Sequence, residues 1–291
     1  MTVPDQRPAY ATGRCYRHPD RVTNIACSRC ERPICPDCMN AAPVGFQCPS
    51  CVRQSQGRPP VRPYGGRVSQ HTGVAAFPVT AVLVAVNVII YVITAAQSSH
   101  GLNDNQYSAL FQKFVLVPDY TAAHHQYVRL IGAAFLHFGL VHLFVNMLSL
   151  VLLGPGLEKI FGWQRFLALY LVSAFGASVA VYLFSSPSAS TVGASGAIFG
   201  LFGALIAVYR RLGLDLRALL PTIAINVILN LTISNLSWQG HIGGAVVGAV
   251  VSFAFVYAPR ERRTLVQAAA VVGFIALFVL LTWWRTNSLV G

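Results

Sequence analysis

Residues 191–200 read TVGASGAIFG and open a long apolar segment, and a second apolar segment opens at residues 240–244 with GHIGG. Ser195 and His241 therefore each stand at the beginning of a stretch that is otherwise apolar. Polar side chains inside a membrane are costly and commonly mark a functional site. The two stretches indicate a membrane fold in which a serine and a histidine act together.

The composition of the whole chain supports a membrane fold. Hydrophobic residues make up 55% of the sequence and charged residues only 10%, which excludes a water-soluble protein over most of its length. A helix needs roughly 20 apolar residues to cross the bilayer. Runs near that length predict seven spans, at 78–96, 136–153, 166–184, 196–209, 217–233, 240–257 and 265–284. We therefore expect an all-α polytopic membrane protein, and no cleavable signal peptide before the first span.

The formal charge of +12 could indicate nucleic-acid binding, but the basic residues follow the membrane instead. They precede the first span and separate spans two and three, four and five, and six and seven, whereas the loops at 185–190 and 234–239 carry no charge. The positive-inside rule then predicts a cytoplasmic N-terminus, an external loop at 97–129 and an external C-terminus. We expect an integral, multi-pass plasma-membrane protein with no nucleic-acid partner.

All 7 cysteines lie in the first 51 residues, ahead of the spans. Together with one histidine they form four pairs of identical spacing: Cys15 and His18, Cys27 and Cys30, Cys35 and Cys38, and Cys48 and Cys51. Eight such ligands suit two tetrahedral, structural Zn²⁺ ions. Disulfides are the alternative, but the odd cysteine count, a reducing cytoplasm and the histidine in a cysteine position count against them.

The order of these pairs resembles B-box-type and related cross-brace zinc fingers, in which the first and third pairs share one ion and the second and fourth share the other. A sequential arrangement stays open, although the four-residue spacer from Cys30 to Cys35 favours the interleaved one. Such modules commonly contact proteins, so we expect a protein partner, with a plain structural role as the alternative.

Composition also divides the chain. Glycines and prolines between positions 57 and 73 prevent a regular helix. We predict a B-box-like zinc module at 1–52, a flexible Pro/Gly/Arg linker at 53–76, a six-helix core at 77–259, and an additional transmembrane helix with an external C-terminus at 260–291.

The predicted orientation of the spans places four polar side chains at the same depth in the membrane. Spans two, four and six all run inward from the outer face, and His142 and Asn146, Ser195, and His241 lie near their respective starts. Glycines spaced along spans four and six form two ridges of small residues that let the backbones approach closely. The alternative is that these glycines serve packing only and Ser195 is one more small interface residue.

The acidic residues limit the chemistry. None of the 9 Asp and Glu residues falls inside a predicted span, so neither a Ser-His-Asp triad nor an aspartyl pair nor a zinc site is expected in the membrane. A Ser-His dyad remains, with His241 as general base for Ser195. The oxyanion would meet the Ser195 N–H, Asn146 and His142, and Phe199, one turn below Ser195, is placed to stack on the imidazole.

With these residues in place, the chain from about residue 78 to 259 resembles the rhomboid family of intramembrane serine proteases. The matching stretches are HFGLVHLFVN at 137–146, GASG at 193–196 and GHIGG at 240–244. The resemblance implies Ser195 as nucleophile, His241 as base, His142 and Asn146 as oxyanion donors, and Gly193 and Gly196 as supporting motif residues. It implies a structural role for His137 and polar helix contacts for Glu158. Where the family often has Trp-Arg, this chain has Val128-Arg129.

The resemblance also implies activity, substrates and cofactors. We expect cleavage of transmembrane segments of membrane proteins near the outer face, with no cofactor for catalysis. Span five, with Pro221, Asn226 and Asn230, resembles a proposed lateral gate, although asparagines bonding across helices are an equal alternative. The seventh span matches a six-plus-one subtype, and we expect it only to anchor the chain.

Two rival functions remain. A non-catalytic rhomboid-like protein that binds client transmembrane helices would typically lack the serine or the histidine, and both are present. A transporter or receptor would need polar residues along a path through the whole membrane, whereas the polarity here is confined to one end.

Overall fold

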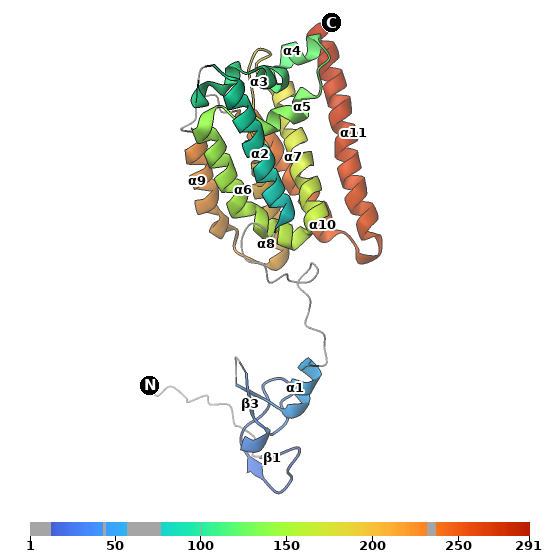
Figure 1. Ribbon diagram of the computed structural model, residues 1–291. Helices are drawn as coiled ribbons and strands as arrows, with labels where there is room; N and C mark the ends of the chain where they lie inside the picture. The colour runs from blue at the N-terminus through green and yellow to red at the C-terminus, as the bar shows by residue number, and fades with distance from the viewer. Residues whose placement is uncertain (1–12, 43–44, 57–76, 100, 232–236) are drawn as a thin grey trace, which may run out of the picture. The chain divides into compact units, whose positions relative to one another are not determined.

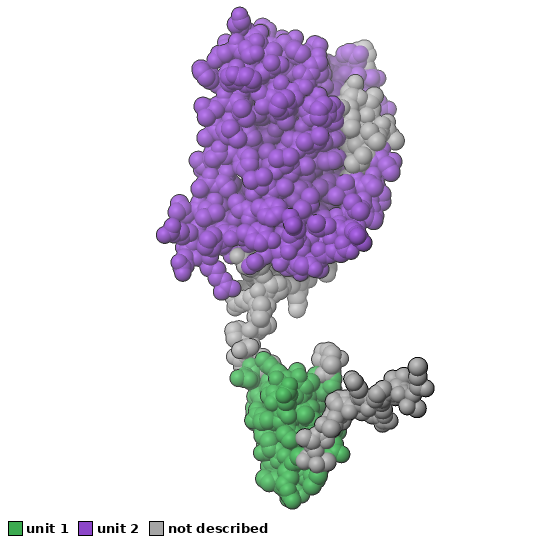
Figure 2. Space-filling model, turned by 180° about the vertical axis from the view of Figure 1, so that it is seen from behind, with its two compact units in different colours: residues 1–63 green, residues 64–291 purple. Residues whose placement is uncertain are grey.

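The computed structural model describes residues 13–42, 45–56, 77–99, 101–231 and 237–291. The chain divides into two compact units, residues 1–63 and residues 64–291, coloured separately in Figure 2. The two units have different cores: that of the first consists mainly of cysteines, and that of the second of apolar helices.

The first unit contains very little regular structure. Strands β1 (Gly13–Arg14) and β2 (Val22–Thr23) pair antiparallel, as do β3 (Asn40–Ala41) and β4 (Phe46–Gln47), and the helix α1 spans Pro49–Gln56. Apart from Ile34, the buried members of its core cluster are all cysteines. A unit with so few apolar side chains needs another source of folding free energy, such as bound metal.

The second unit is a bundle of helices (Figure 1). Six helices within the described residues are long and apolar enough to cross a membrane: α2 (Pro78–Gln97), α6 (Gly139–Phe161), α7 (Trp163–Phe184), α8 (Ser195–Leu212), α10 (Trp238–Tyr257) and α11 (Arg263–Val290). The expectation of an all-α polytopic membrane fold is thereby confirmed.

The fifth predicted span differs from expectation. The structure describes a 3₁₀ turn at Leu216–Leu219 followed by the helix α9 at Leu220–Leu231, which is only 12 residues long. Pro221 stands at the second position of this helix, where a missing N–H costs nothing. The end of the predicted span, at 232–233, and the side chains of Asn226 and Asn230 lie outside the described residues, so the gate prediction stays a prediction.

The predicted external loop is largely helical. It contains a 3₁₀ helix at Leu102–Tyr107 and the short helices α3 (Ala109–Phe114) and α4 (Pro118–Ala123). At its end begins α5 (Arg129–Gly132), which is followed by a 3₁₀ turn at Ala133–Phe135. Arg129 is buried and donates from Nη1 to the carbonyls of Gln112 (2.9 Å) and Val115 (2.7 Å). Arg129 thus links the start of α5 to the C-terminal end of α3, next to an exposed Val128.

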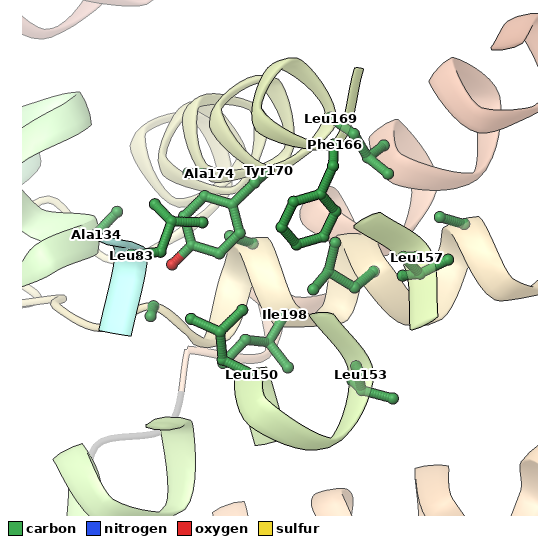
Figure 3. Close-up of a cluster of buried hydrophobic side chains, with 14 of the residues drawn as sticks. Leu83, Ala134, Leu150, Leu153, Leu157, Phe166, Leu169, Tyr170, Ala174 and Ile198 are labelled. Atoms are coloured by element: carbon green, nitrogen blue, oxygen red, sulfur yellow. The ribbon is translucent and has the colours of Figure 1, made fainter. Parts of the chain in front are cut away.

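The core of the bundle forms around α7. Phe166, Leu169 and Tyr170 of this helix are fully buried and pack with Leu150 of α6 and Ile198 of α8 (Figure 3). These large side chains fill one face of α7, and its small residues face α8 and α10.

Helices α8 and α10 approach so closely that glycine is required on both. A Cβ added at Gly244 would collide with the carbonyl oxygen of Gly196, and one at Gly248 would collide with that of Gly200. On α8, a Cβ at Gly203 would collide with the carbonyl oxygen of Ala245 on α10. The other predicted ridge glycines point toward α7: a Cβ at Gly196 would meet Ala177, one at Gly200 would meet Ser173, and one at Gly240 would meet Val181.

Glu158 corrects the expectation that every acidic residue lies outside the spans. Helix α6 continues past Pro155 to Phe161, so Glu158 is inside it and is 4% exposed. Its carboxylate accepts hydrogen bonds from the backbone N–H groups of Val79 (3.0 Å) and Thr80 (2.9 Å) and from the Thr80 hydroxyl. It therefore caps the N-terminus of α2, where unpaired N–H groups favour an anion.

Candidate active site

The candidate site is built where α8 and α10 begin. The Oγ atom of Ser195 lies 2.8 Å from Nε2 of His241, a hydrogen-bond distance. Ser195 is the first residue of α8 and His241 lies in the first turn of α10, and both side chains are less than a tenth exposed. The close packing of the two helices brings together residues 46 positions apart in the sequence.

The chain enters α8 through a tightly constrained approach. Leu116 and Thr191 exchange two backbone hydrogen bonds (3.2 and 2.9 Å), and the N–H of Gly193 donates to the carbonyl of Ala133. Gly193 then takes a φ of 122°, which side-chain-bearing residues rarely adopt. Glycine is required at position 193 for a second reason, since a Cβ there would lie 2.8 Å from Cε1 of His142.

The imidazole of His241 is supported by an aromatic ring. Phe199 stacks on it with ring centroids 4.1 Å apart and an interplanar angle of 4°. No described acidic side chain lines the site, and Glu158 is 16 residues along α6 from His142, which is about 24 Å at the helical rise. The stacked ring of Phe199 therefore orients the imidazole of His241, which is the role that a carboxylate has in a Ser-His-Asp triad.

His142 faces the serine across Gly193. Its Nδ1 accepts a hydrogen bond from the backbone N–H of Phe138 (3.2 Å), so in the neutral tautomer the proton is assigned to Nε2. A Cβ on Gly193 would lie 2.9 Å from that Nε2 and 3.8 Å from Ser195 Oγ. The Nε2–H thus points into the space beside the serine, as an oxyanion donor would have to.

Asn146 takes a less direct position. Its amide donates to the carbonyl of His142 (2.9 Å) one turn earlier on α6, and its side chain is 2% exposed. It is not among the residues that line the cavity beside Ser195. The structure therefore brings Ser195, His241, His142, Phe199 and Gly193 into direct contact or near contact, and Asn146 is connected to them through the carbonyl of His142.

Two further polar residues support this arrangement. His137 is fully buried and meets the ring of His142 edge-on at 5.2 Å, and its two ring nitrogens have no partner among the described residues. Asn105, from the predicted external loop, donates to the carbonyl of His137 and accepts from the N–H of Gly139. Sequence reasoning missed Asn105 because these two partners lie more than 30 residues away.

A small cavity adjoins Ser195. Its volume is about 40 Å³, and small side chains such as Ala133, Ala174, Ala177 and Ser178 line it. The cavity is therefore small and lies next to the serine hydroxyl.

The first unit contains two candidate metal centres. Cys15, His18, Cys35 and Cys38 form one cluster, and Cys27, Cys30, Cys48 and Cys51 form the other, with all ligand atoms of a cluster within 4.8 Å of one another. This is the interleaved pairing, and all seven cysteines are free thiols. Nδ1 of His18 lies 3.3 Å from the sulfur of Cys35 and 3.5 Å from that of Cys38.

The surroundings of the thiols fit a soft divalent cation. Burial and neighbouring thiols raise the pKa of Cys38 to about 11 and that of Cys51 to about 12, so a cation must displace their protons. Backbone N–H groups donate to the sulfurs of Cys27 (3.2 Å) and Cys48 (3.3 Å), which favours the thiolate form. Cys₃His and Cys₄ sets of this kind suit Zn²⁺.

Comparison with known proteins gives a consistent picture. Residues 124–258 match the family model described as Rhomboid domain. "RHOMBOID-like protein 1" of Arabidopsis thaliana is 36% identical over 143 residues, which cover 47% of this chain and 36% of that protein. "Rhomboid protease GluP" of Bacillus subtilis (strain 168) is 35% identical over 165 residues, which cover 53% of this chain and 32% of that protein.

A shorter relative is matched over most of its length. "Putative rhomboid protease YdcA" of Bacillus subtilis (strain 168) is 34% identical over 146 residues, which cover 48% of this chain and 73% of that protein. Of the two longer relatives, by contrast, the chain spans only about a third of the length.

Proposed function

The chain belongs to the rhomboid family, and on that premise we propose that it is an intramembrane serine endopeptidase with Ser195 as nucleophile and His241 as base. The observation that carries the proposal is the 2.8 Å contact between Ser195 Oγ and His241 Nε2. It is supported by the stacked Phe199, which holds the imidazole in one plane. Relatives named as proteases favour hydrolysis as the chemistry.

The proposed reaction follows from the positions of the donors. His241 Nε2 takes the proton of Ser195 Oγ as the oxygen attacks a peptide carbonyl, and the imidazolium then gives that proton to the leaving amine. The tetrahedral oxyanion accepts hydrogen bonds from Nε2–H of His142 and from the Ser195 N–H, which has no intrahelical partner at the start of α8. The second amide hydrogen of Asn146 is a further candidate donor. A water molecule then attacks the acyl carbonyl while His241 Nε2 takes its proton. The bond between the acyl carbon and Ser195 Oγ breaks, and the imidazolium gives the proton back to Ser195 Oγ.

The proposal extends to substrates and location. The site opens within a bundle of apolar helices, so the substrates are transmembrane segments of other membrane proteins in the bilayer. We place the protein in the plasma membrane. The distribution of arginines between spans supports an orientation with the N-terminus cytoplasmic, the C-terminus outside and cleavage near the outer face.

The proposal for the first unit is a structural one. Residues 1–52 bind two Zn²⁺ ions through the two clusters and contact a protein partner, and the segment 53–76 links them to the protease core at 77–259 and the additional helix at 260–291. No metal takes part in the proposed peptide hydrolysis.

Cleavage in liposomes tests the protease assignment. We expect wild-type protein to cut a single-pass model substrate, Ser195→Ala and His241→Ala to be inactive, and Ser252→Ala to stay active. Ser252 is a matched control because it is a buried serine on α10 that bonds to the carbonyl of Ala204, away from the site. Cleavage that survives Ser195→Ala would refute the proposal.

A second measurement covers the case of a poorly chosen substrate. A fluorophosphonate probe reacts with an activated serine and needs no substrate recognition. We expect it to label Ser195 in the wild type and to label nothing in His241→Ala. If neither cleavage nor labelling occurs, the alternative of a non-catalytic protein that binds client helices is favoured instead.

A further inference from the structure

A second cavity lies between α11 and the segment that precedes α6. Its volume is about 310 Å³, much larger than that of the cavity beside Ser195. Tyr127, Leu130 and Ile131, at and before α5, form one wall. Figure 1 shows α5 and α4 beside the C-terminal part of α11, so the cavity lies toward one end of the membrane-spanning region.

The other walls come from two spanning helices. Phe175 of α7 and Val279, Thr282 and Trp283 of α11 line the rest of the cavity. Trp283 is 65% exposed and Val279 56% exposed, whereas Thr282 and Leu130 are almost fully buried. The cavity therefore opens on the surface that faces lipid and extends inward to the contact between α7 and α11.

Water is a poor occupant for this cavity. A volume of 310 Å³ equals that of roughly ten water molecules, and each buried water needs about three polar partners. The lining offers two hydroxyls. That of Tyr127 is paired with Nδ1 of His125 (3.1 Å), and Oγ1 of Thr282 has no partner among the described residues. A water cluster would be anchored to the protein at very few points and would lie against apolar side chains on most sides, which is unfavourable.

An empty cavity is equally unfavourable, because the lining side chains would lose their packing partners. In a bilayer the neighbouring molecules are lipids, and the cavity opens toward them. We propose that this cavity binds one acyl chain of a membrane phospholipid, which completes the packing between α11 and the core. The proposal rests on the membrane-spanning fold and does not depend on proteolytic activity.

Photolabelling of the full-length protein tests the proposal. The protein is reconstituted in phosphatidylcholine vesicles that contain a phosphatidylcholine with a diazirine at mid-chain, and labelled peptides are mapped by mass spectrometry. We expect Leu130 and Ile131 to be labelled more strongly than Val82 and Ile89, which are exposed on α2 and meet only exchanging lipid.

A substitution that fills the cavity provides the decisive comparison. Val279→Trp should reduce labelling of residues 130–131 by roughly tenfold, since the larger side chain excludes the acyl chain. The matched control is Val272→Trp, on the same helix and similarly exposed (63%) but outside the cavity; it should leave the labelling unchanged. If Val279→Trp fails to fold, Ile131→Trp fills the cavity from the other wall, and loss of labelling at residues 279–283 is then expected.

The contrary results are equally specific. Labelling of residues 130–131 no stronger than that of α2, or labelling that Val279→Trp leaves unchanged in folded protein, would overturn the proposal.

Discussion

At the scale of single residues, the candidate site depends on side chains that have little freedom. Ser195 and His241 are in contact, Phe199 is stacked on the imidazole, and Gly193 separates Ser195 from His142 without filling the space between them. The gap left by the missing side chain of Gly193 is where a carbonyl oxygen could approach both donors.

Gly193→Ala should therefore reduce cleavage by roughly 100-fold, the cost of disturbing one oxyanion donor. The added Cβ would meet the ring of His142, and the φ of 122° would be strained. Gly213→Ala is the control, because Gly213 also has a positive φ but has nothing within 4 Å. Initial rates in liposomes for both variants measure the effect; equal losses would mean that backbone strain and not the His142 contact is responsible.

Phe199 should be replaceable only by another flat ring. We expect Phe199→Tyr to keep most of the activity and Phe199→Leu to lose roughly 10- to 100-fold, since a small displacement of a catalytic group has effects of this size. Rates of fluorophosphonate labelling report the change at Ser195 directly. Full activity in Phe199→Leu would contradict an orienting role for the stacked ring.

The sequence predicted that these residues would lie close together, because the motifs stand at the starts of apolar segments; their catalytic roles stay a proposal. It did not predict Asn105, which bonds to residues more than 30 positions away. It expected polar contacts for Glu158 but placed this residue outside the span, because the predicted span ended at residue 153 whereas α6 continues past Pro155. Nothing local distinguishes such residues from ordinary polar ones.

At the scale of elements, the separation of α8 and α10 determines whether the serine and histidine can meet. Glycines on one helix lie against backbone carbonyls of the other, a packing that is typical of membrane helices. The glycine spacing predicted this contact, whereas the helical content of the segment 97–129 was not predicted, because short capped turns leave no periodic pattern.

Gly248→Val should destabilise the bundle, since its Cβ would meet the carbonyl of Gly200. Overpacking of this kind costs about 1–3 kcal/mol, so the temperature of thermal unfolding in detergent should fall. Gly273→Val on α11 is the matched control, because nothing lies within 4 Å of it, and it should unfold like wild type. A normal unfolding temperature for Gly248→Val would contradict the close packing.

Glu158→Gln should loosen the start of α2. The amide group has one acceptor oxygen where the carboxylate has two, so one of the hydrogen bonds from Val79 and Thr80 is lost at a cost of about 1–3 kcal/mol. Thermal unfolding should shift downward, while Glu261→Gln, an exposed residue in the turn before α11, should have no effect. Activity well below the unfolding temperature should persist, because Glu158 is distant from Ser195.

At the scale of the whole molecule, the chain combines a unit organised by cysteines with one organised by apolar helices. Composition alone separated the two, because cysteines are confined to the first 51 residues and apolar runs to the rest. The number of full spans was harder to predict, since Pro221 and the turn before it shorten the regular part of the fifth.

Zinc content tests the first unit in the full-length protein. We expect two Zn²⁺ per chain by elemental analysis, and one in the double variant Cys15→Ser with Cys35→Ser, because both residues belong to one cluster. In a sequential arrangement the same two changes would damage both sites and leave no tightly bound zinc. The interleaved and sequential pairings therefore give different metal counts.

The support of His241 by Phe199 instead of a carboxylate also affects how the protein can be made. A charged side chain at the centre of a helix makes its entry into the bilayer less favourable by about 2.5–3.5 kcal/mol. Helices α8 and α10 bring the serine, the histidine and the aromatic ring together without any acidic residue, and the basic residues of α8 stand at its far end. Each helix can therefore leave the ribosome and enter the lipid on its own, and the reactive group forms only after the helices have associated.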